Sequence, residues 1–369
     1  MPKVVIAPDS FKGSISATAA ASAIAEGVRR AQPSATIIEA PMADGGEGTL
    51  EILVQALGGQ MRRARVSGAM GDTIDAPIGL IRDATTAVIE IASIAGYSMA
   101  TTRPRDPLRA TTFGVGQAIR VAMETGIEQI ILALGGSATV DGGAGMLQAL
   151  GIIPLDIDRR PIASPAGGGD LIRIDRLAWD RPPEHLEQVE FTIACDVLNP
   201  ACGPNGAAVV FGPQKGADDS AVAKLDAGLS NWAGVLERMS GRPLRDEPGT
   251  GSAGGVALPL LALLNAHIVP GVDLIADAIG LREKIVEADL VITGEGRLDR
   301  QSLMGKVVGS VARMAHCANV PCVAVVGTTG DGVASCLSVL DDYEVIGGPI
   351  EETTPRLADA AERVLRSLM

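Results

Sequence analysis

Short, continuous apolar runs alternate with helical patterns at both ends of the chain. Near the N-terminus, apolar runs at 3–7 and 35–40 flank an Ala-rich stretch at 16–30. Continuous apolar runs of this length are typical of parallel strands that are buried on both faces. The C-terminal part repeats the alternation, with predicted strands at 289–293 and 322–326, a helix around 303–315 between them, and a closing helix at 355–368. The pattern therefore predicts parallel β-α units at both ends.

The middle of the chain has a different pattern. Apolar runs at 74–81 and 87–91 flank four turn-forming residues, which predicts a hairpin. Buried strands are also predicted at 130–134 and 191–194, and a helix at 111–125. We therefore expect an α/β protein in which residues 1–64 and 281–369 form a doubly wound parallel-sheet domain. Residues 65–280 are expected to form a mixed α/β domain inserted in it.

Charge and composition narrow the classes of function. Asp and Glu number 44 against 31 Lys and Arg, so the net charge is −13. A polyanion is repelled at long range by such a chain, and only 8 of its residues are aromatic, so a nucleic-acid partner is not expected. A small anionic substrate remains compatible, because a local pocket can reverse the sign of the field.

The sequence also predicts a cytoplasmic protein without a membrane partner. The five cysteines include no C-x-x-C pair, which favours reduced thiols. The N-terminal residues lack the pattern of a signal peptide. The longest stretch without Asp, Glu, Lys or Arg, 248–272, contains prolines and glycines, so we expect no membrane span there.

Polar and glycine-rich segments follow the predicted strands, where ligands of open α/β sheets bind. The first strand leads into Asp9, Ser10 and Lys12, shortly before a predicted helix whose N-terminus would favour an anion. By themselves these residues fit equally well a helix cap with an exposed lysine.

Two later strands end in glycine pairs, each beside a carboxylate. They are Asp44-Gly45-Gly46 and the segment that runs from Gly135-Gly136-Ser137 to Asp141. Glycine costs backbone entropy, and close approach to phosphate oxygens is one reason to place it in such a loop. Tight turns alone would not explain the neighbouring carboxylates.

Acids also follow two further strands, at Asp196 and at Glu295 and Asp299. Carboxylates in this position can bind Mg²⁺ or accept a proton from a substrate hydroxyl. Each acid alone could equally be a helix cap or part of an ion pair, but their recurrence at several strand ends favours an active site. The chain has only three histidines, no P-loop and no G-x-G-x-x-G after its first strand.

Six motifs, in order, resemble those of the type-1 glycerate kinase family. They are PDSFKGS, MADGGEGT, LGGSATVDGGAGMLQALG, CDVLNP with GPNGAAVVFGPQKGA, GTGSAGG, and ITGEGRLDRQSLMGK. The resemblance implies that the γ-phosphoryl group of ATP is transferred to D-glycerate, with Mg²⁺, in the cytoplasm. Members of that family usually have Asn where this chain has Val140, and often His where it has Met304. A shifted substrate preference or rate would follow if either side chain touched the substrate.

Within this interpretation, each candidate residue receives a role. Asp196 is expected to be the base that orients the substrate hydroxyl, and Lys12 to bind a phosphate or the glycerate carboxylate. Asp141 is the alternative base, and Glu295 and Asp299 are the expected Mg²⁺ ligands. Substrate binding is assigned to Asp9, Ser10, Asp44, Gly45 and Gly46, and ATP phosphate binding to Gly135, Gly136, Ser137, Gly254 and Gly255.

Three other classes share parts of this pattern. A nicotinamide-dependent oxidoreductase would have the same α/β class, but the fingerprint after the first strand is missing. A non-catalytic sugar-acid-binding protein would not need the repeated acids, and a phosphatase would not need ATP. The sequence favours the kinase, and it leaves open both the acceptor hydroxyl and the oligomeric state.

Overall fold

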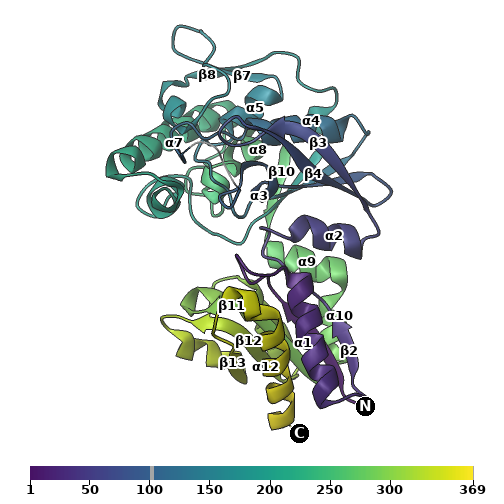
Figure 1. Cartoon of the computed structure of the whole chain (residues 1–369). Helices are drawn as coiled ribbons and strands as arrows, with labels where there is room; N and C mark the ends of the chain where they lie inside the picture. The colour runs from purple at the N-terminus through teal and green to yellow at the C-terminus, as the bar shows by residue number, and fades with distance from the viewer. Residues whose placement is uncertain (100–103, 369) are drawn as a thin grey trace. The chain divides into compact units, whose positions relative to one another are not determined.

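The computed structural model describes residues 1–99 and 104–368. Contacts between residues divide the chain into two units (Figure 1). Met1–Asp44 and Pro270–Met369 form the first unit, and Gly45–Val269 forms the second.

The first unit is built on a five-stranded sheet in which all neighbouring strands are parallel. In spatial order its strands are β13 (Asp342–Val345), β12 (Cys322–Thr329), β11 (Leu290–Leu298), β1 (Lys3–Pro8) and β2 (Thr36–Glu39). Segments from both termini thus meet in one sheet. The carboxyl ends of β1 and β11 lie side by side, because Pro8 is paired with Gly294.

Helices cover both faces of this sheet, which explains its continuous apolar strands. Val4 and Ile6 of β1 pack in one cluster with α1 (Ala17–Ala31) and α12 (Thr353–Leu368), which lie side by side in Figure 1. Val5 points to the opposite face, because side chains alternate along a strand, and it is equally buried. That unit also contains α9 (Gly271–Ile279), α10 (Leu281–Val286) and α11 (Val307–Cys317), of which α11 packs on β11 and β12.

The second unit contains a mixed six-stranded sheet in the order β10-β9-β6-β5-β4-β3. Its strands are β3 (Gln60–Ser67), β4 (Thr73–Ile81), β5 (Thr86–Glu90), β6 (Gln129–Ala133), β9 (Glu190–Ala194) and β10 (Asn265–Val269). The strands β5, β6, β9 and β10 are parallel, whereas β3–β4 and β4–β5 are antiparallel. The predicted hairpin is thus confirmed as β4 and β5, joined by a tight turn in which Arg82, Asp83 and Ala84 have positive φ.

The helices of the second unit surround this sheet together with a small hairpin. They are α2 (Thr49–Ala56), α3 (Ala92–Ala95), α4 (Phe113–Met123), α5 (Ala144–Ala149), α6 (Ala207–Phe211), α7 (Asp219–Ser240) and α8 (Ala257–Leu263), with the hairpin formed by β7 (Ile152–Leu155) and β8 (Arg176–Trp179). Trp232 of α7 is fully buried in the core, and its indole N–H donates to the carbonyl oxygen of Gly142 at 2.8 Å. Core packing therefore holds one of the glycine-rich loops directly.

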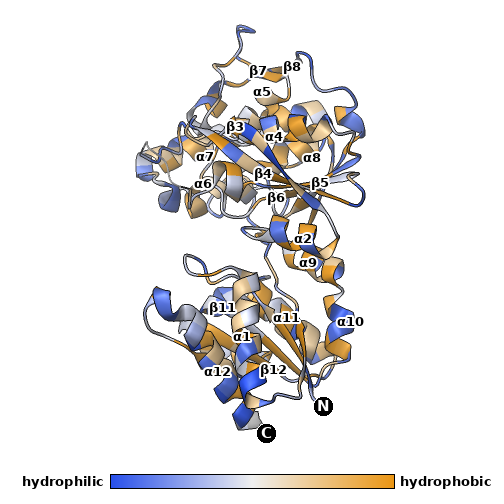
Figure 2. Ribbon diagram, turned by 45° about the vertical axis from the view of Figure 1, so that its right-hand side comes forward, coloured by the Kyte–Doolittle hydropathy of each residue, from blue (hydrophilic) through white to orange (hydrophobic). Residues whose placement is uncertain are grey.

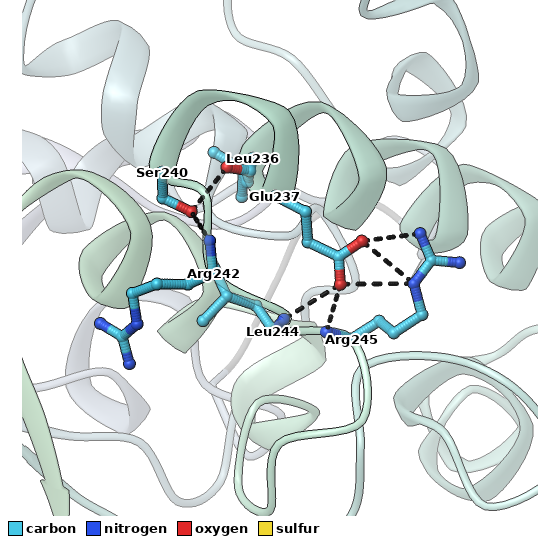
Figure 3. A network of polar contacts seen from close by, with 6 residues as sticks. All are labelled: Leu236, Glu237, Ser240, Arg242, Leu244 and Arg245. Atoms are coloured by element: carbon cyan, nitrogen blue, oxygen red, sulfur yellow. Dashed lines mark hydrogen bonds and ion pairs between the residues drawn. The ribbon is translucent and has the colours of Figure 1, made fainter.

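Polar contacts fix the chain where α7 ends (Figure 3). The Glu237 carboxylate accepts backbone N–H groups from Leu244 and Arg245, and it pairs with the Arg245 guanidinium at 2.8 Å. Arg245 lowers the pKa of Glu237 to about 2, mainly through these hydrogen bonds. This network stabilises the turn that follows α7.

The strands of the first unit have hydrophobic colours in Figure 2, whereas much of α10 and α12 is coloured hydrophilic.

The α/β class and the inserted mixed domain are confirmed, and the chain divides between the two units at other residues than 65 and 280. The second unit begins at Gly45 and ends at Val269, whereas the sequence predicted 65 and 280. The physical reason is strand pairing. All of β3 pairs with β4, α2 packs on β4 and β5, and β10 pairs with β9. Among the described residues, no helix is both long and apolar enough to cross a membrane.

Candidate active site

Four charged residues gather at the carboxyl ends of β1, β2 and β11 in the first unit. Asp9 follows β1 directly and is 4% exposed, and Glu295 lies on β11 and is 6% exposed. The Lys12 ammonium lies 3.6 Å from the carboxylate of Asp44, the residue at which the first unit's N-terminal segment ends. The predicted substrate residues Asp9, Lys12 and Asp44 are therefore brought together, with Glu295 close enough to affect the pKa of Asp9.

Burial and mutual repulsion perturb these carboxylates. Burial, followed by the Asp44 charge, raises the pKa of Asp9 to about 7. A hydrogen bond from the Ser10 backbone N–H at 2.6 Å opposes that rise. The Asp44 carboxylate raises the pKa of Lys12, which holds the ammonium in its charged form. A buried acid that titrates near neutral pH beside a fixed cation is typical of a functional site.

The loop from Asp9 to Ser14 is a separate turn before α1, which begins at Ala17. Phe11 and Ile15 exchange backbone hydrogen bonds across it. Ser16 caps the helix through a hydrogen bond from the Ala19 N–H, and Ser14 donates to Thr353 instead. The loop that carries Lys12 therefore does not cap α1, and 65% of the Lys12 side chain is exposed.

The two expected Mg²⁺ ligands differ in environment. Glu295 is buried, which raises its pKa, and its Oε1 atom has no hydrogen-bond partner among the described residues. Asp299 caps a short 3₁₀ turn by accepting the Gln301 N–H at 2.8 Å, and it lies 3.5 Å from Arg297. Among the described residues, no three His, Cys, Asp or Glu side chains are grouped closely enough to hold a metal ion. Glu295 thus offers an unused oxygen, whereas the Asp299 oxygens are already engaged.

In the second unit, two glycine pairs pack against each other. The Gly135 N–H donates to the Gly45 carbonyl oxygen at 3.0 Å. A Cβ atom on Gly135 would lie 2.5 Å from the Cα of Gly46, a distance at which no side chain fits. Close backbone approach therefore explains why Gly135 is glycine, and it brings the predicted substrate-binding pair beside the predicted phosphate-binding loop.

The loop continues through Gly136, which has φ +75° and is exposed, to Ser137, which is 7% exposed. The buried Lys215 holds this part of the loop through two hydrogen bonds. Its ammonium donates to Ser137 Oγ at 3.0 Å and to the Thr139 carbonyl oxygen at 2.7 Å. Lys215 is 4% exposed, and burial lowers its pKa to about 7.

Asp141 is fully buried and holds the other end of the loop. Its Oδ2 atom accepts the backbone N–H and the hydroxyl of Thr112, both at 2.7 Å, and the N–H of Gly145 at 3.3 Å. Its Oδ1 atom accepts the Gly143 N–H at 3.3 Å. Burial raises the pKa of Asp141, and these hydrogen bonds oppose the rise. The arrangement suits an anchor of the loop better than a base in contact with substrate.

Gly254 and Gly255 lie against the same loop. Both have positive φ, and the Gly254 carbonyl oxygen accepts the Gly142 N–H at 3.0 Å. A Cβ atom on Gly254 would lie 2.2 Å from the Thr139 carbonyl oxygen. The structure thus joins the predicted glycine segments into one backbone assembly in the second unit.

Three parallel neighbouring strands end beside this assembly. Glu90 is the last residue of β5, Gly135 follows β6, and the half-buried Asp196 follows β9, with Ala133 paired both to Glu90 and to Ala194. Their carboxyl ends therefore share one edge of the sheet. The position of Asp196 agrees with the expected strand-end location, and its role as the base stays a prediction.

Sequence reasoning missed two buried ionisable residues, Glu90 and Lys215. Glu90 accepts the N–H groups of Gly48 and Leu50 at 3.2 Å, which fixes the start of α2 behind the first glycine pair, and burial raises its pKa to about 7. The signal for Glu90 was its place at a strand end, and Lys215 stood inside the GPQKGA motif.

Val140 and Met304, which differ from the residues that the family usually has at these positions, lie in opposite environments. Val140 is fully buried in the core of the second unit, and Met304 is 71% exposed.

A family model for the glycerate kinase family matches residues 4–369, nearly the whole chain. The chain belongs to the glycerate kinase family. The match covers all six motifs and both units described above.

Individual relatives agree with this assignment. Proteins named glycerate kinase from Halalkalibacterium halodurans and Haemophilus influenzae are 45% and 43% identical, covering 90% and 93% of this chain and 87% and 88% of theirs. An Escherichia coli protein named glycerate 2-kinase is 42% identical over 90% of this chain and 86% of its own. A crystal structure from Salmonella typhimurium, of a candidate glycerate kinase 2, superimposes with a TM-score of 0.84 at 38% identity, covering 100% of this chain and 98% of that one.

Proposed function

We propose that the protein is an ATP-dependent glycerate kinase that transfers the γ-phosphoryl group to the 2-hydroxyl of D-glycerate. The observation that carries the proposal is the family match across residues 4–369, supported by named relatives above 40% identity. The name of the Escherichia coli relative favours the 2-hydroxyl as acceptor. The oxidoreductase and sugar-acid-binding alternatives receive no comparable support.

Phosphoryl transfer depends on positioning and on stabilising negative charge, and the two units contain groups suited to both. In the first unit, Lys12 keeps its positive charge beside Asp44 and is exposed enough to meet an anion, either a phosphate or the glycerate carboxylate. Asp9 and Ser10 belong to the same turn and are assigned to the substrate. Burial and the Asp44 charge raise the pKa of Asp9 to about 7, which favours a carboxyl group that can bind or release a proton.

We assign the phosphates of ATP to the glycine assembly of the second unit. Gly135, Gly136 and Ser137 follow β6, and Gly254 and Gly255 support the loop through the backbone of Thr139 to Gly142. Backbone N–H groups in such loops bind anions without a side chain in the way.

Asp196 is our choice for the group that accepts the proton of the attacking hydroxyl. It lies at the strand-end edge that also carries Gly135, and a carboxylate in that position can orient a hydroxyl toward the γ-phosphorus. Asp141 is our second choice for this base. Its carboxylate oxygens already accept hydrogen bonds from Thr112, Gly143 and Gly145, which favours a role in positioning the loop.

A divalent cation fits Glu295 better than Asp299. The buried Glu295 Oε1 atom lacks a partner among the described residues, and carboxylate oxygens are the preferred ligands of Mg²⁺. When bound with ATP, Mg²⁺ supplies positive charge that offsets the charge on the phosphates. Asp299 would have to give up its contacts with Gln301 or Arg297 to take part.

A coupled ADP assay tests the proposal. The purified protein should form ADP only when ATP, D-glycerate and Mg²⁺ are all present, and omission of any one should reduce the rate to background. L-glycerate and glycerol serve as controls for configuration and for the carboxylate. ADP formation that is independent of D-glycerate at saturating ATP and Mg²⁺ would falsify the proposal.

A further inference from the structure

Lys215 is a buried lysine, and its charged form is unfavourable unless other groups in the fold compensate for the loss of water. It is 4% exposed and lies in a short 3₁₀ turn, Pro213–Lys215, next to the loop after β6. Taking an ammonium group out of water is strongly unfavourable unless hydrogen bonds or an opposite charge compensate. Two of its three N–H donors are used by Ser137 Oγ and the Thr139 carbonyl oxygen.

The bond to Ser137 determines what that hydroxyl can do. A serine hydroxyl has one proton to donate and lone pairs with which to accept. While Lys215 is protonated it can only donate, so Ser137 Oγ is the acceptor and the serine's own proton remains for another group. None of the hydrogen bonds among the described residues uses that proton. Ser137 is thus held as a donor beside the exposed Gly136.

The charge of Lys215 is only partly balanced within the fold. The Asp141 carboxyl group raises the pKa of Lys215, but its oxygens also accept hydrogen bonds from Thr112, Gly143 and Gly145. Burial lowers the pKa of Lys215 to about 7 despite Asp141. An anion on the loop would supply the missing opposite charge and would favour the protonated amine.

We propose that Lys215 is a positioning residue for nucleotide binding, which orients Ser137 as a hydrogen-bond donor to a phosphate of ATP and adds positive charge next to the Gly135–Ser137 loop. The inference rests on the proposed function, because it takes the anion to be a phosphate of the nucleotide. It adds a buried side chain to a site that was otherwise assigned to backbone N–H groups.

The experiment measures binding of ADP by calorimetry in the absence of glycerate, so that turnover is not needed. Lys215→Met keeps much of the length of the side chain and removes its charge. We expect ADP to bind about 10- to 100-fold more weakly, the range for loss of a charge-assisted hydrogen bond. Lys224→Met, which changes an exposed lysine on α7, is the matched control and should bind ADP like the wild type.

A double-mutant cycle separates positioning from a general structural effect. If Lys215 acts through Ser137, then Ser137→Ala alone should weaken ADP binding, and the double variant should be only slightly worse than Lys215→Met. The KM for ATP should rise in both single variants, and the KM for D-glycerate should change by less than about 3-fold. Circular dichroism and Tm establish that each variant is folded, and if Lys215→Met does not fold, Ser137→Ala and Lys215→Arg carry the test.

Two results would overturn the inference while leaving the proposed function intact. One is ADP binding in folded Lys215→Met and Ser137→Ala that equals that of the wild type. The other is a rise in the KM for D-glycerate with no change in the KM for ATP, which would place the acceptor substrate on this loop. Failure of the proposed function itself would appear as a wild-type protein without glycerate-dependent ADP formation.

Discussion

Replacing Gly135 by alanine tests whether close packing of two glycine loops is essential to the second unit. Gly135 has no positive φ, so alanine is compatible with its backbone conformation. The obstacle is space, because the new Cβ atom would lie 2.5 Å from Gly46 Cα, 3.0 Å from Gly46 N and 3.3 Å from the Gly45 carbonyl oxygen. These are backbone atoms and cannot rotate away, so one loop must move relative to the other.

The size of the effect follows from overpacking. An inserted methyl group that forces a backbone shift costs about 1–3 kcal/mol. For a unit of this size, each kcal/mol lowers Tm by about 2–4 °C, so we expect a decrease of about 2–12 °C. A displacement of about 1 Å in a loop that positions phosphates can lower kcat/KM by about 10²-fold.

Differential scanning calorimetry and the coupled ADP assay measure the two effects. The control is Gly234→Ala, inside α7, where the nearest atoms to a Cβ are flexible guanidinium nitrogens of Arg245 and Arg238. That variant should be stabilised by about 0.5–1 kcal/mol, because alanine favours a helix over glycine. If Gly135→Ala has the Tm and the kcat/KM of the wild type, the packing argument for this loop is refuted.

Three further predictions concern single charged residues. Lys12→Met should lower kcat/KM by about 10- to 100-fold, because it removes a charge-assisted contact to an anion, and an unchanged value in steady-state assays would exclude Lys12 from the site. Asp196→Asn should lower kcat by about 10²- to 10⁴-fold with little change in Mg²⁺ dependence, whereas a higher Mg²⁺ requirement that Mn²⁺ relieves would make Asp196 a metal ligand. Glu237→Gln should lower the free energy of unfolding at pH 7 by about 1–3 kcal/mol, because hydrogen bonds from Arg245 and from two backbone N–H groups are weakened. Since the folded-state pKa of Glu237 is depressed to about 2, this difference should shrink as the pH falls from about 4.5 to about 2, and urea titrations that show a constant difference over that range would contradict it.

The strands of the core could be predicted from the sequence because each is a continuous apolar run. Most residues of β1, β11 and β12 are buried on both faces of the sheet, so each strand contains an unbroken apolar run that is visible in the sequence. β3 escaped prediction because it is an edge strand with three arginines and pairs only with β4, so most of its residues are exposed. The expected boundary at 65 falls inside β3 for that reason.

The part of the candidate site that follows the carboxyl ends of strands could be predicted from the sequence. Asp9 follows β1, Asp44 lies in the segment after β2, and Glu295 lies on β11. These three strands are parallel neighbours, so their carboxyl ends share one edge of the sheet. The roles of buried ionisable groups could not be predicted, because they depend on partners that are distant in sequence. Lys215 is 78 residues from Ser137, and Glu90 is 40 residues from Leu50. Periodicity carries no information about such contacts.

The most direct test of the central claim is proton-coupled phosphorus NMR of the reaction with ATP, Mg²⁺ and D-glycerate. The account predicts that the γ-phosphate signal of ATP declines while a phosphomonoester doublet grows, since a phosphate on the 2-oxygen couples to a single carbon-bound proton. A triplet would place the phosphate on the 3-oxygen and contradict the assigned acceptor. Inorganic phosphate as the only new signal besides those of ADP, or no change in the presence of D-glycerate, would contradict the kinase activity itself.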